Sequence, residues 1–407
     1  MVRENSRRLS GSRQFRQRLV LATLTSTTVT IDDIRSGDAA PGLRPHEVSL
    51  LRLLDKISDH HTIDLNETGM DLFPRALLML AVLPALCLWL CGACRNEAEV
   101  PAGGDYRREG PRARLWGAPG DRLLPRAPHT AWPLRQSAHS DSAQRRWLRI
   151  TNDTKDPSVD TFRMTTLHML KHFGVPLEGL ELKIDSRGSP PLGGGEVFLR
   201  VPIINSTLTA ANWTDEGMVK RIRGVSFTTR VSPQIENRII YAARGIFNRF
   251  IPDVHIFTDH RSGSAGGRSP GYGVSLVAET TTGCLLSVDV TVSYPSVDEM
   301  NEESEKPELM SPEDLGVQAA SMLLEEVAQG GVVDSTHQGL LFILCALCPP
   351  DVSKVRVGQL TPYGIETLRN IRDFLDIKFV IKPDPNSNTV TLICVGAGVK
   401  NLARKSS

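Results

Sequence analysis

The sequence feature that most constrains the fold is an alternation of strand-like and helix-like segments that returns about three times along the chain. In its first occurrence, alternating apolar residues at 28–32 predict a strand, and the leucine-rich segment 45–58 predicts an amphipathic helix. The same order recurs at 148–203 and again after Ser311. Alternating strands and helices favour layered α/β structure around a shared core. We therefore predict an α/β (α+β) fold of repeated α/β modules.

The apolar spacing also predicts the remaining elements of each repeat. The first repeat is expected to include a helix around 19–24 and a strand at 61–65. The second is expected to contain a helix at 161–173 and strands at 148–151, 180–185 and 196–201. The third is expected to contain helices at 312–329, 335–347 and 365–375 and strands at 354–357, 378–382 and 389–395.

A unit of different pattern separates the second and third repeats. It has one long predicted helix at 233–250 and predicted strands at 225–230, 255–258, 273–279 and 283–289. About ninety residues with this pattern are enough for a small inserted α/β domain. We therefore divide the chain into modules one and two at 1–203, an inserted domain at 204–292 and a third module at 293–407.

Residues 72–147 differ in composition from the sequence on either side. This window contains eleven arginines, no lysine, no isoleucine and four of the five tryptophans. Such a composition is typical of a GC-rich gene translated in a shifted frame, so we interpret the window as a frame-shifted or mis-spliced segment. Two alternatives are a Pro/Arg/Gly-rich linker at 97–146 and a membrane span at 76–94, where nineteen residues carry no charge. Transcript sequence across both junctions decides between them.

The overall charge gives no general argument for nucleic-acid binding, because the chain has 47 basic and 46 acidic residues. Any contact with RNA is therefore expected to be local. The candidates for RNA or partner binding surround the start of the inserted domain: Lys220, Arg221, Arg223 and Arg230.

The cysteines and clustered carboxylates do not suggest a metal centre. Cys345 and Cys348 form a C-x-x-C pair, but it ends an apolar segment and has no second ligand pair at metal spacing. Asp153, Asp156 and Asp160 are close in sequence, yet they are interpreted as loop and helix-cap residues. We predict free thiols and no metal.

A glycine-rich loop carries the resemblance to a known family. The loop contains Arg187, Gly188, Pro191, Gly193, Gly194 and Gly195. Three consecutive glycines allow another chain segment or a phosphate to approach the backbone closely. This loop resembles the signature of the RNA 3'-terminal phosphate cyclases. The segments at 41–45, 151–160, 278–284 and 330–334 match the same family in order.

The resemblance is closer to the cyclase-like branch of that family, through segments 15–24, 220–224, 230–234 and 323–327. The active cyclases use a histidine near the C-terminus to take AMP from ATP. Aligning 357–361 with the family places Tyr363 at that position, and no histidine lies between His337 and the C-terminus. The early loop of the enzymes corresponds here to Gly11–Phe15, which lacks their acid and their consecutive glycines.

The resemblance therefore implies the RNA 3'-terminal phosphate cyclase fold without cyclase chemistry, a catalytic residue or a cofactor. It implies a nucleolar factor of the small-subunit processome, needed for early cleavage of pre-rRNA in the nucleus. The implied partners are a ribosome-assembly GTPase, pre-rRNA and a small nucleolar ribonucleoprotein, with no membrane. Two alternatives remain open: a pre-rRNA endoribonuclease and an active ATP-dependent RNA 3'-phosphate cyclase.

Overall fold

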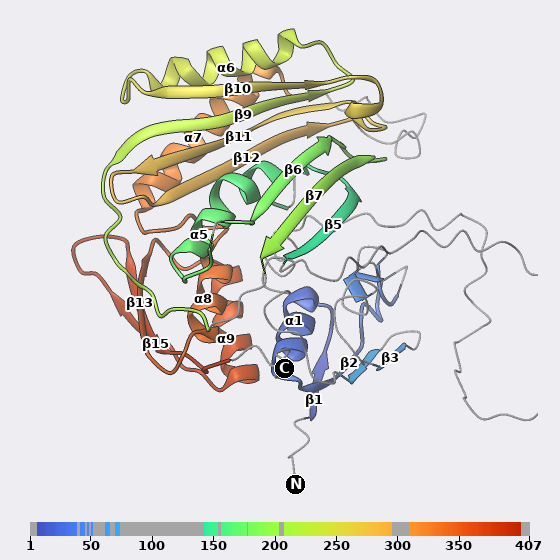
Figure 1. Ribbon diagram of the computed structural model, residues 1–407, viewed down its shortest axis with the longest axis vertical. Helices are drawn as coiled ribbons and strands as arrows, with labels where there is room; N and C mark the ends of the chain where they lie inside the picture. Colours follow the sequence, from blue (N-terminus) through green and yellow to red (C-terminus); the bar gives the residue numbers. More distant parts are fainter. Residues whose placement is uncertain are drawn as a thin grey trace, which may run out of the picture.

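Three small sheets and their helices form the lower and middle parts of the protein (Figure 1). The computed structural model describes residues 6–38, 41–44, 47–48, 50–51, 62–65, 70–73, 142–153, 156–176, 178–202, 207–294 and 309–399. The first sheet has the order β1-β2-β4-β3, the second β5-β7-β6 and the third β14-β15-β13-β8. The predicted α/β class is confirmed.

The first sheet begins with a parallel pair. Strand β1 (Ser6–Ser10) lies beside β2 (Thr28–Asp32), and helix α1 (Phe15–Thr25) connects them. Strands β4 (Met70–Phe73) and β3 (Thr62–Leu65) continue the sheet in antiparallel pairing. Strand β1 was not predicted, because its sequence SRRLS is polar and none of its residues is fully buried.

The second module places one interrupted helix against a three-stranded antiparallel sheet. The strands are β5 (Ser142–Arg149), β6 (Glu181–Ser186) and β7 (Gly195–Pro202). The predicted helix at 161–173 is divided into α4 (Val159–Thr161), the π-helical η1 (Phe162–Thr166) and α5 (Leu167–Lys171).

The third module combines two helices with a four-stranded sheet. The helices are α8 (Gln338–Leu347) and α9 (Pro362–Leu375), and the strands are β13 (Val352–Val357), β14 (Val380–Pro383) and β15 (Val390–Val395), with the two-residue β8 (Asn212–Trp213) at one edge. All ten residues of α8 are buried. Helix α9 begins where Thr361 Oγ1 accepts a hydrogen bond from the Gly364 N–H at 2.9 Å, followed by Pro362.

The inserted domain forms the upper part of the molecule in Figure 1 and has its own core. Its sheet has the order β10-β9-β11-β12. Helices α6 (Gln234–Phe247) and α7 (Pro312–Gln329) pack against each other and against the sheet. The strands are β9 (Val219–Thr229), β10 (Val254–Arg261), β11 (Gly271–Thr280) and β12 (Leu285–Ser293), with the 3-10 turn η2 (Gly263–Gly266) after β10.

The packing of the structure divides the chain differently from the predicted boundaries of the inserted domain, 204 and 292. At the first boundary, Trp213 belongs to the main core, and its strand β8 pairs with β13 of the third module. At the second, α7 contributes buried Leu315 and Leu323 to the core of the inserted domain, although it was assigned to the third module. The helix was predicted correctly, but the choice of core depends on packing that its amphipathic pattern does not specify.

The atypical window 72–147 lies mostly outside the described residues. Strand β4 reaches its first residues, and β5 covers its end by pairing with β7 in register from Ser142 to Arg149. The strand predicted at 148–151 therefore begins earlier, inside the window. No described helix is long and apolar enough to cross a bilayer, and the candidate span at 76–94 lies outside the described residues.

The assignment of α7 predicts how the inserted domain responds to truncation of a side chain. Leu323→Ala should lower the free energy of unfolding by about 2–5 kcal/mol, because Leu323 is fully buried against α6 and the sheet. Met322→Ala, on the exposed side of the same helix, is the matched control and should change it by less than about 0.5 kcal/mol. Urea unfolding monitored by circular dichroism measures both, and equal effects would contradict the assignment.

Candidate functional site

The signature loop is a buried junction between the second module and the inserted domain. The Arg187 side chain is completely buried, and its two terminal nitrogens donate to the Asp160 carboxylate at 2.6 and 2.9 Å. Its Nε donates to Asp259 of β10 at 2.8 Å. Its guanidinium also lies 5.0 Å from the centre of the Phe227 ring on β9. Arg187 therefore connects two elements of the inserted domain to the second module.

The charges of this junction hold each other in the ionised state. Burial alone would raise the pKa of Asp160, but the charge and hydrogen bonds of Arg187 hold that pKa below its ordinary value. Burial likewise opposes the charge on Arg187, whose pKa is nevertheless raised by Asp160 and Asp259. Asn152 adds a hydrogen bond from Arg187 Nη1 to its Oδ1 at 3.0 Å. A buried ion pair with this many hydrogen bonds is a structural connection.

The backbone of the inserted domain packs closely against the glycines of the loop. Gly193 and Gly194 have positive φ angles of 62° and 87°. The Arg268 N–H donates to the Gly193 carbonyl at 2.8 Å, and a β-carbon on Gly194 would lie 3.0 Å from Arg268 Cγ. Of the two predicted roles for these glycines, close approach of another chain segment is the one that the structure shows.

The other members of the signature lie around the same junction. Gly188 exchanges hydrogen bonds with Thr151, its carbonyl accepting from the Thr151 N–H at 2.8 Å and its N–H donating to Thr151 Oγ1 at 3.2 Å. Pro191 follows a cis peptide bond, and Gly195 begins β7. Arg230 contributes from the side of the inserted domain, because its Nε donates to the Gly267 carbonyl at 2.7 Å. Arg230 therefore supports the turn that packs on the loop and lies apart from the other predicted RNA-binding residues.

The two positions at which we placed the loss of cyclase chemistry lie close together. Helix α1 packs on α9. Arg13, in the loop Gly11–Phe15, contacts Glu366 with 3.0 Å between Nη2 and Oε1. Glu366 lies one helical turn after Tyr363, which is 38% exposed. Residues some 350 positions apart in the sequence are thus close together in the structure.

Polar side chains fill the space between these helices by bonding to each other. Gln17 Nε2 donates to Thr367 Oγ1 at 2.8 Å, and Asn370 Nδ2 donates to Gln17 Oε1 at 2.6 Å. All three residues are buried. Amides, hydroxyls and a phenol cannot form the phosphoramidate that an imidazole forms with AMP.

His337, the last histidine in the sequence, is a core residue. Its Nδ1 lies 2.8 Å from Asp334 Oδ1, its Nε2 lies 2.8 Å from Thr166 Oγ1, and its side chain is 1% exposed. Burial lowers the pKa of His337, but the Asp334 carboxylate outweighs it and raises that pKa above its ordinary value. A histidine held in this way has no access to a nucleotide from outside.

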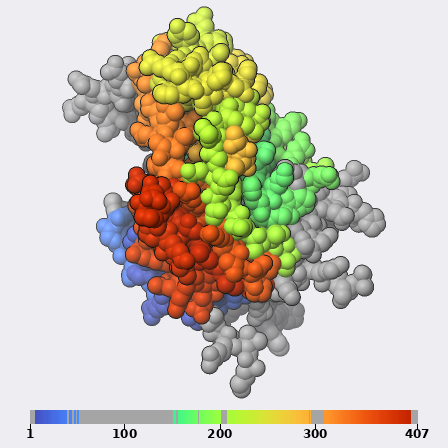
Figure 2. Space-filling model, turned by 90° about the vertical axis from the view of Figure 1, so that its left-hand side faces the viewer, coloured from blue at the N-terminus to red at the C-terminus, as the bar shows by residue number. Residues whose placement is uncertain are grey.

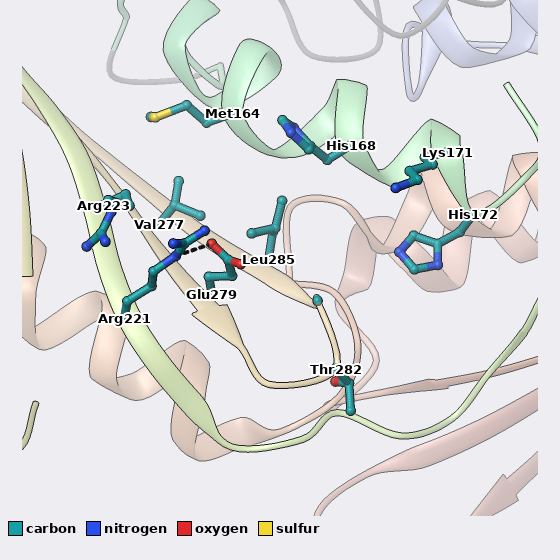
Figure 3. A pocket seen from close by; sticks show the side chains of 11 residues that line it. Met164, His168, Lys171, His172, Arg221, Arg223, Val277, Glu279, Thr282 and Leu285 are labelled. Carbon is teal, nitrogen blue, oxygen red and sulfur yellow. Dashed lines mark hydrogen bonds and ion pairs between the residues drawn. The ribbon is translucent and has the colours of Figure 1, made fainter. Parts of the chain in front are cut away.

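A basic cleft of about 580 Å³ lies between the second module and the inserted domain (Figure 3). One wall is the helical segment that carries Met164, His168 and Lys171, and the other is β9 with Arg221 and Arg223 (Figure 3). Strand β11 adds Glu279, the one carboxylate in the lining. Three permanent cations against one carboxylate make the cleft electropositive.

The arginines of the cleft are oriented by carboxylates. Arg221 Nε donates to Glu279 at 2.6 Å, and Lys220 Nζ shares the same carboxylate at 2.8 Å. Arg223 makes a two-point contact with Asp253 at 2.8 and 2.9 Å. The Arg221 side chain remains 41% exposed and that of Arg223 28% exposed. Both guanidiniums therefore keep donors that an anionic ligand can reach.

The structure brings together three of the four residues predicted to bind RNA or a partner, Lys220, Arg221 and Arg223; their binding role stays a prediction. It adds three residues that we did not single out: His168, Lys171 and His172. Their spacing with Met164 is i, i+4, i+7 and i+8, which places all four on one side of a helix. The helical spacing of these four residues can be read from the sequence, but the sequence does not show which strand forms the opposite wall of the cleft.

The remaining candidate residues, the aspartates and cysteines, form contacts within the protein. Asp160 is paired with Arg187, and Asp156 lies 3.5 Å from Arg16. Cys345, Cys348 and Cys394 are buried free thiols. Burial raises the pKa of Cys348 to about 12. Among the described residues, no group of three His, Cys, Asp or Glu side chains could hold a metal ion.

Two family models match the chain. The model of the RNA 3'-terminal phosphate cyclases matches residues 7–77, and the model of the insert domain of these cyclases matches residues 214–328. The second match begins after β8 and covers all but the last residue of α7. It thus coincides with the unit that packing defines.

Whole-length relatives occur in plants, animals and fungi. A probable RNA 3'-terminal phosphate cyclase-like protein of Arabidopsis thaliana is 51% identical over 98% of this chain and 99% of its own length. The RNA 3'-terminal phosphate cyclase-like protein of Homo sapiens is 41% identical over 97% of this chain and 96% of its own. The rRNA processing protein rcl1 of Schizosaccharomyces pombe is 34% identical over 98% of both chains.

The buried junction predicts a large difference between two arginines that contact the same carboxylate. Arg187→Met should lower the free energy of unfolding by about 3–5 kcal/mol, because Asp160 and Asp259 lose their buried partner. Arg163→Met is the matched control: Arg163 contacts Asp160 at 3.5 Å with a side chain 41% exposed, so the loss should stay near 0–1 kcal/mol. Equal losses in denaturant unfolding would refute the structural role of Arg187.

Proposed function

Because this chain belongs to the RNA 3'-terminal phosphate cyclase-like family, we propose that it is a non-catalytic factor in rRNA processing. The observation that carries the proposal is the closed layer of polar side chains from Gln17, Thr367 and Asn370. This layer lies beside Tyr363, which we align with the cyclase nucleophile. The name of the Schizosaccharomyces pombe relative, an rRNA processing protein, supports the process.

In this proposal the protein works in the nucleolus as part of the small-subunit processome, where early cleavages of pre-rRNA depend on it. Its partners are a ribosome-assembly GTPase, pre-rRNA and a small nucleolar ribonucleoprotein. The proposed task is binding and positioning. The buried junctions at Arg187 and His337 support it, because they hold the modules in one arrangement that can present a fixed surface.

The basic cleft is the proposed contact with RNA. Phosphate oxygens accept hydrogen bonds from arginine and lysine, and such contacts position an RNA without reading its sequence. Lys171 and His168 lie on the helical wall of the cleft and Arg221 and Arg223 on the strand wall, so an RNA backbone that runs along the cleft would meet donors from both walls (Figure 3).

The absence of cyclase chemistry is tested with labelled nucleotide. The wild-type protein incubated with ATP labelled in its α-phosphate should form no covalent adduct with AMP. Tyr363→His should also form none, because the loop Gly11–Phe15 and the polar layer remain unchanged. Acid-labile labelling of the wild-type chain on a gel would show that the protein is a cyclase after all.

The cleft is tested by association with pre-ribosomal particles. Arg221→Ala together with Arg223→Ala should weaken RNA binding by roughly 10-fold or more near 0.1 M salt, since two phosphate contacts are lost. The fraction of the protein that sediments with pre-ribosomes on a sucrose gradient should fall accordingly.

Arg238→Ala is the matched control for this experiment. Arg238 forms the same kind of two-point ion pair as Arg223, with Glu313 at 2.6 and 2.7 Å, but on α6 and away from the cleft. Unchanged sedimentation of the double variant, or an equal loss for Arg238→Ala, would discard the cleft as the contact.

A further inference from the structure

A second basic hollow lies on the outer face of the third module. The inner face of β13 carries the buried residues Ser353, Val355 and Val357, and the outer face carries Lys354 and Arg356. Lys382 of β14 and Thr391 of β15 lie beside them in a hollow of about 410 Å³. Such a volume lies within the usual range of ligand-binding clefts.

The strand register concentrates positive charge in this hollow. Thr391 pairs with Arg356 on one side and with Lys382 on the other, and Lys354 lies two residues before Arg356. Lys354 and Lys382 are exposed, and neither forms an ion pair within the part of the chain that the structure describes. Both ammonium groups are available to an anion.

The one carboxylate in the lining is already engaged. Asp384 accepts hydrogen bonds from the Asn386 N–H at 3.0 Å, Ser387 Oγ at 3.0 Å and Arg356 Nη2 at 3.2 Å. These donors, the Asn386 N–H first, hold the pKa of Asp384 below its usual value. The remaining charge of the hollow favours a polyanion.

A short piece of chain joins this hollow to the basic cleft. His172, which lines the cleft, stacks on Trp213 with 3.9 Å between ring centres. The next residue, Thr214, lines the second hollow, and Asn212 pairs with Lys354. In Figure 2, yellow-green chain lies at the surface between the red third module and the green second module. The two hollows are therefore neighbours along one face.

We propose that the cleft and the second hollow form one continuous track for the backbone of single-stranded RNA, with Lys354, Arg356 and Lys382 as phosphate contacts. The track rests on the proposed function, because it extends the RNA contact at Arg221 and Arg223. No aromatic side chain lines the second hollow, so its contacts are ionic and independent of base sequence.

The track is tested by the length dependence of RNA binding. The probes are oligouridylates of about 6 nucleotides, a length within the range of known single-strand sites, and of about 20 nucleotides, chosen to span both hollows. Lys354→Gln together with Lys382→Gln should weaken binding of the longer probe by about 10- to 30-fold at 0.1 M salt and lower the salt slope by about 1.4. The shorter probe should bind these variants as it binds the wild type.

Lys183→Gln is the matched control for Lys382→Gln. Lys183 lies on β6 of the second module, and its side chain is 68% exposed. Its substitution removes the same charge at a position away from the track. It should leave binding of both probes within about twofold. Thermal melting of each variant checks that these exposed substitutions leave the fold intact.

The outcomes separate the track from the cleft. Binding of the shorter probe can require Arg221 and Arg223 while binding of the longer probe is unchanged by Lys354→Gln and Lys382→Gln. In that case the track is wrong and the RNA contact in the cleft is supported. If the wild type binds neither probe, both are wrong. An oligoglutamate that binds more tightly than RNA, and weakens with Lys354→Gln and Lys382→Gln, would make an acidic protein segment the occupant and overturn the assignment to RNA.

Discussion

Burying the Arg187 guanidinium requires the second module and the inserted domain to supply the carboxylates that neutralise it. Asp160 comes from the helix of the second module and Asp259 from a strand of the inserted domain, so the charge is satisfied in one relative placement of the two. An unpaired buried charge costs several kcal/mol, which penalises other placements. The width of the basic cleft between the same two units depends on this constraint.

A second buried cluster connects all three parts of the molecule. Asp334 and His337 belong to the third module, Ser287 to the inserted domain and Thr166 to the second module. Asp334 accepts hydrogen bonds from the N–H and the hydroxyl of Ser287 at 2.8 and 2.6 Å. With Arg187 at one point and His337 at another, the inserted domain is held at two places. Asp334, His337, Ser287 and Thr166 thus fix the relative placement of the three parts.

Buried polar side chains bond to each other beside Tyr363, the residue that we align with the cyclase nucleophile. Gln17 bonds to Thr367 and Asn370, so helices α1 and α9 satisfy each other's polar groups across their interface. Satisfied buried polar groups stabilise a contact, whereas a nucleotide site keeps donors open for its ligand. Accessible basic side chains line the basic cleft and the second hollow. Side chains of this kind suit the RNA contact that we propose.

The sequence by itself determined the local structure and the family. Periodicity located α7, α9 and the hairpin β14–β15 closely, because capping residues such as Ser311 and Thr361 act within one turn. The loop at 187–195 identified the family, and Tyr363 led us to predict the loss of cyclase chemistry. Tertiary structure alone decided that α7 joins the inserted domain and β8 the third module, since an apolar helix face or a two-residue strand fits more than one core. It also decided that Lys171 and Arg221 line one cleft and that Arg230 does not, because the cleft is formed by segments about fifty residues apart in the sequence. The approach of these segments depends on the buried charge of Arg187.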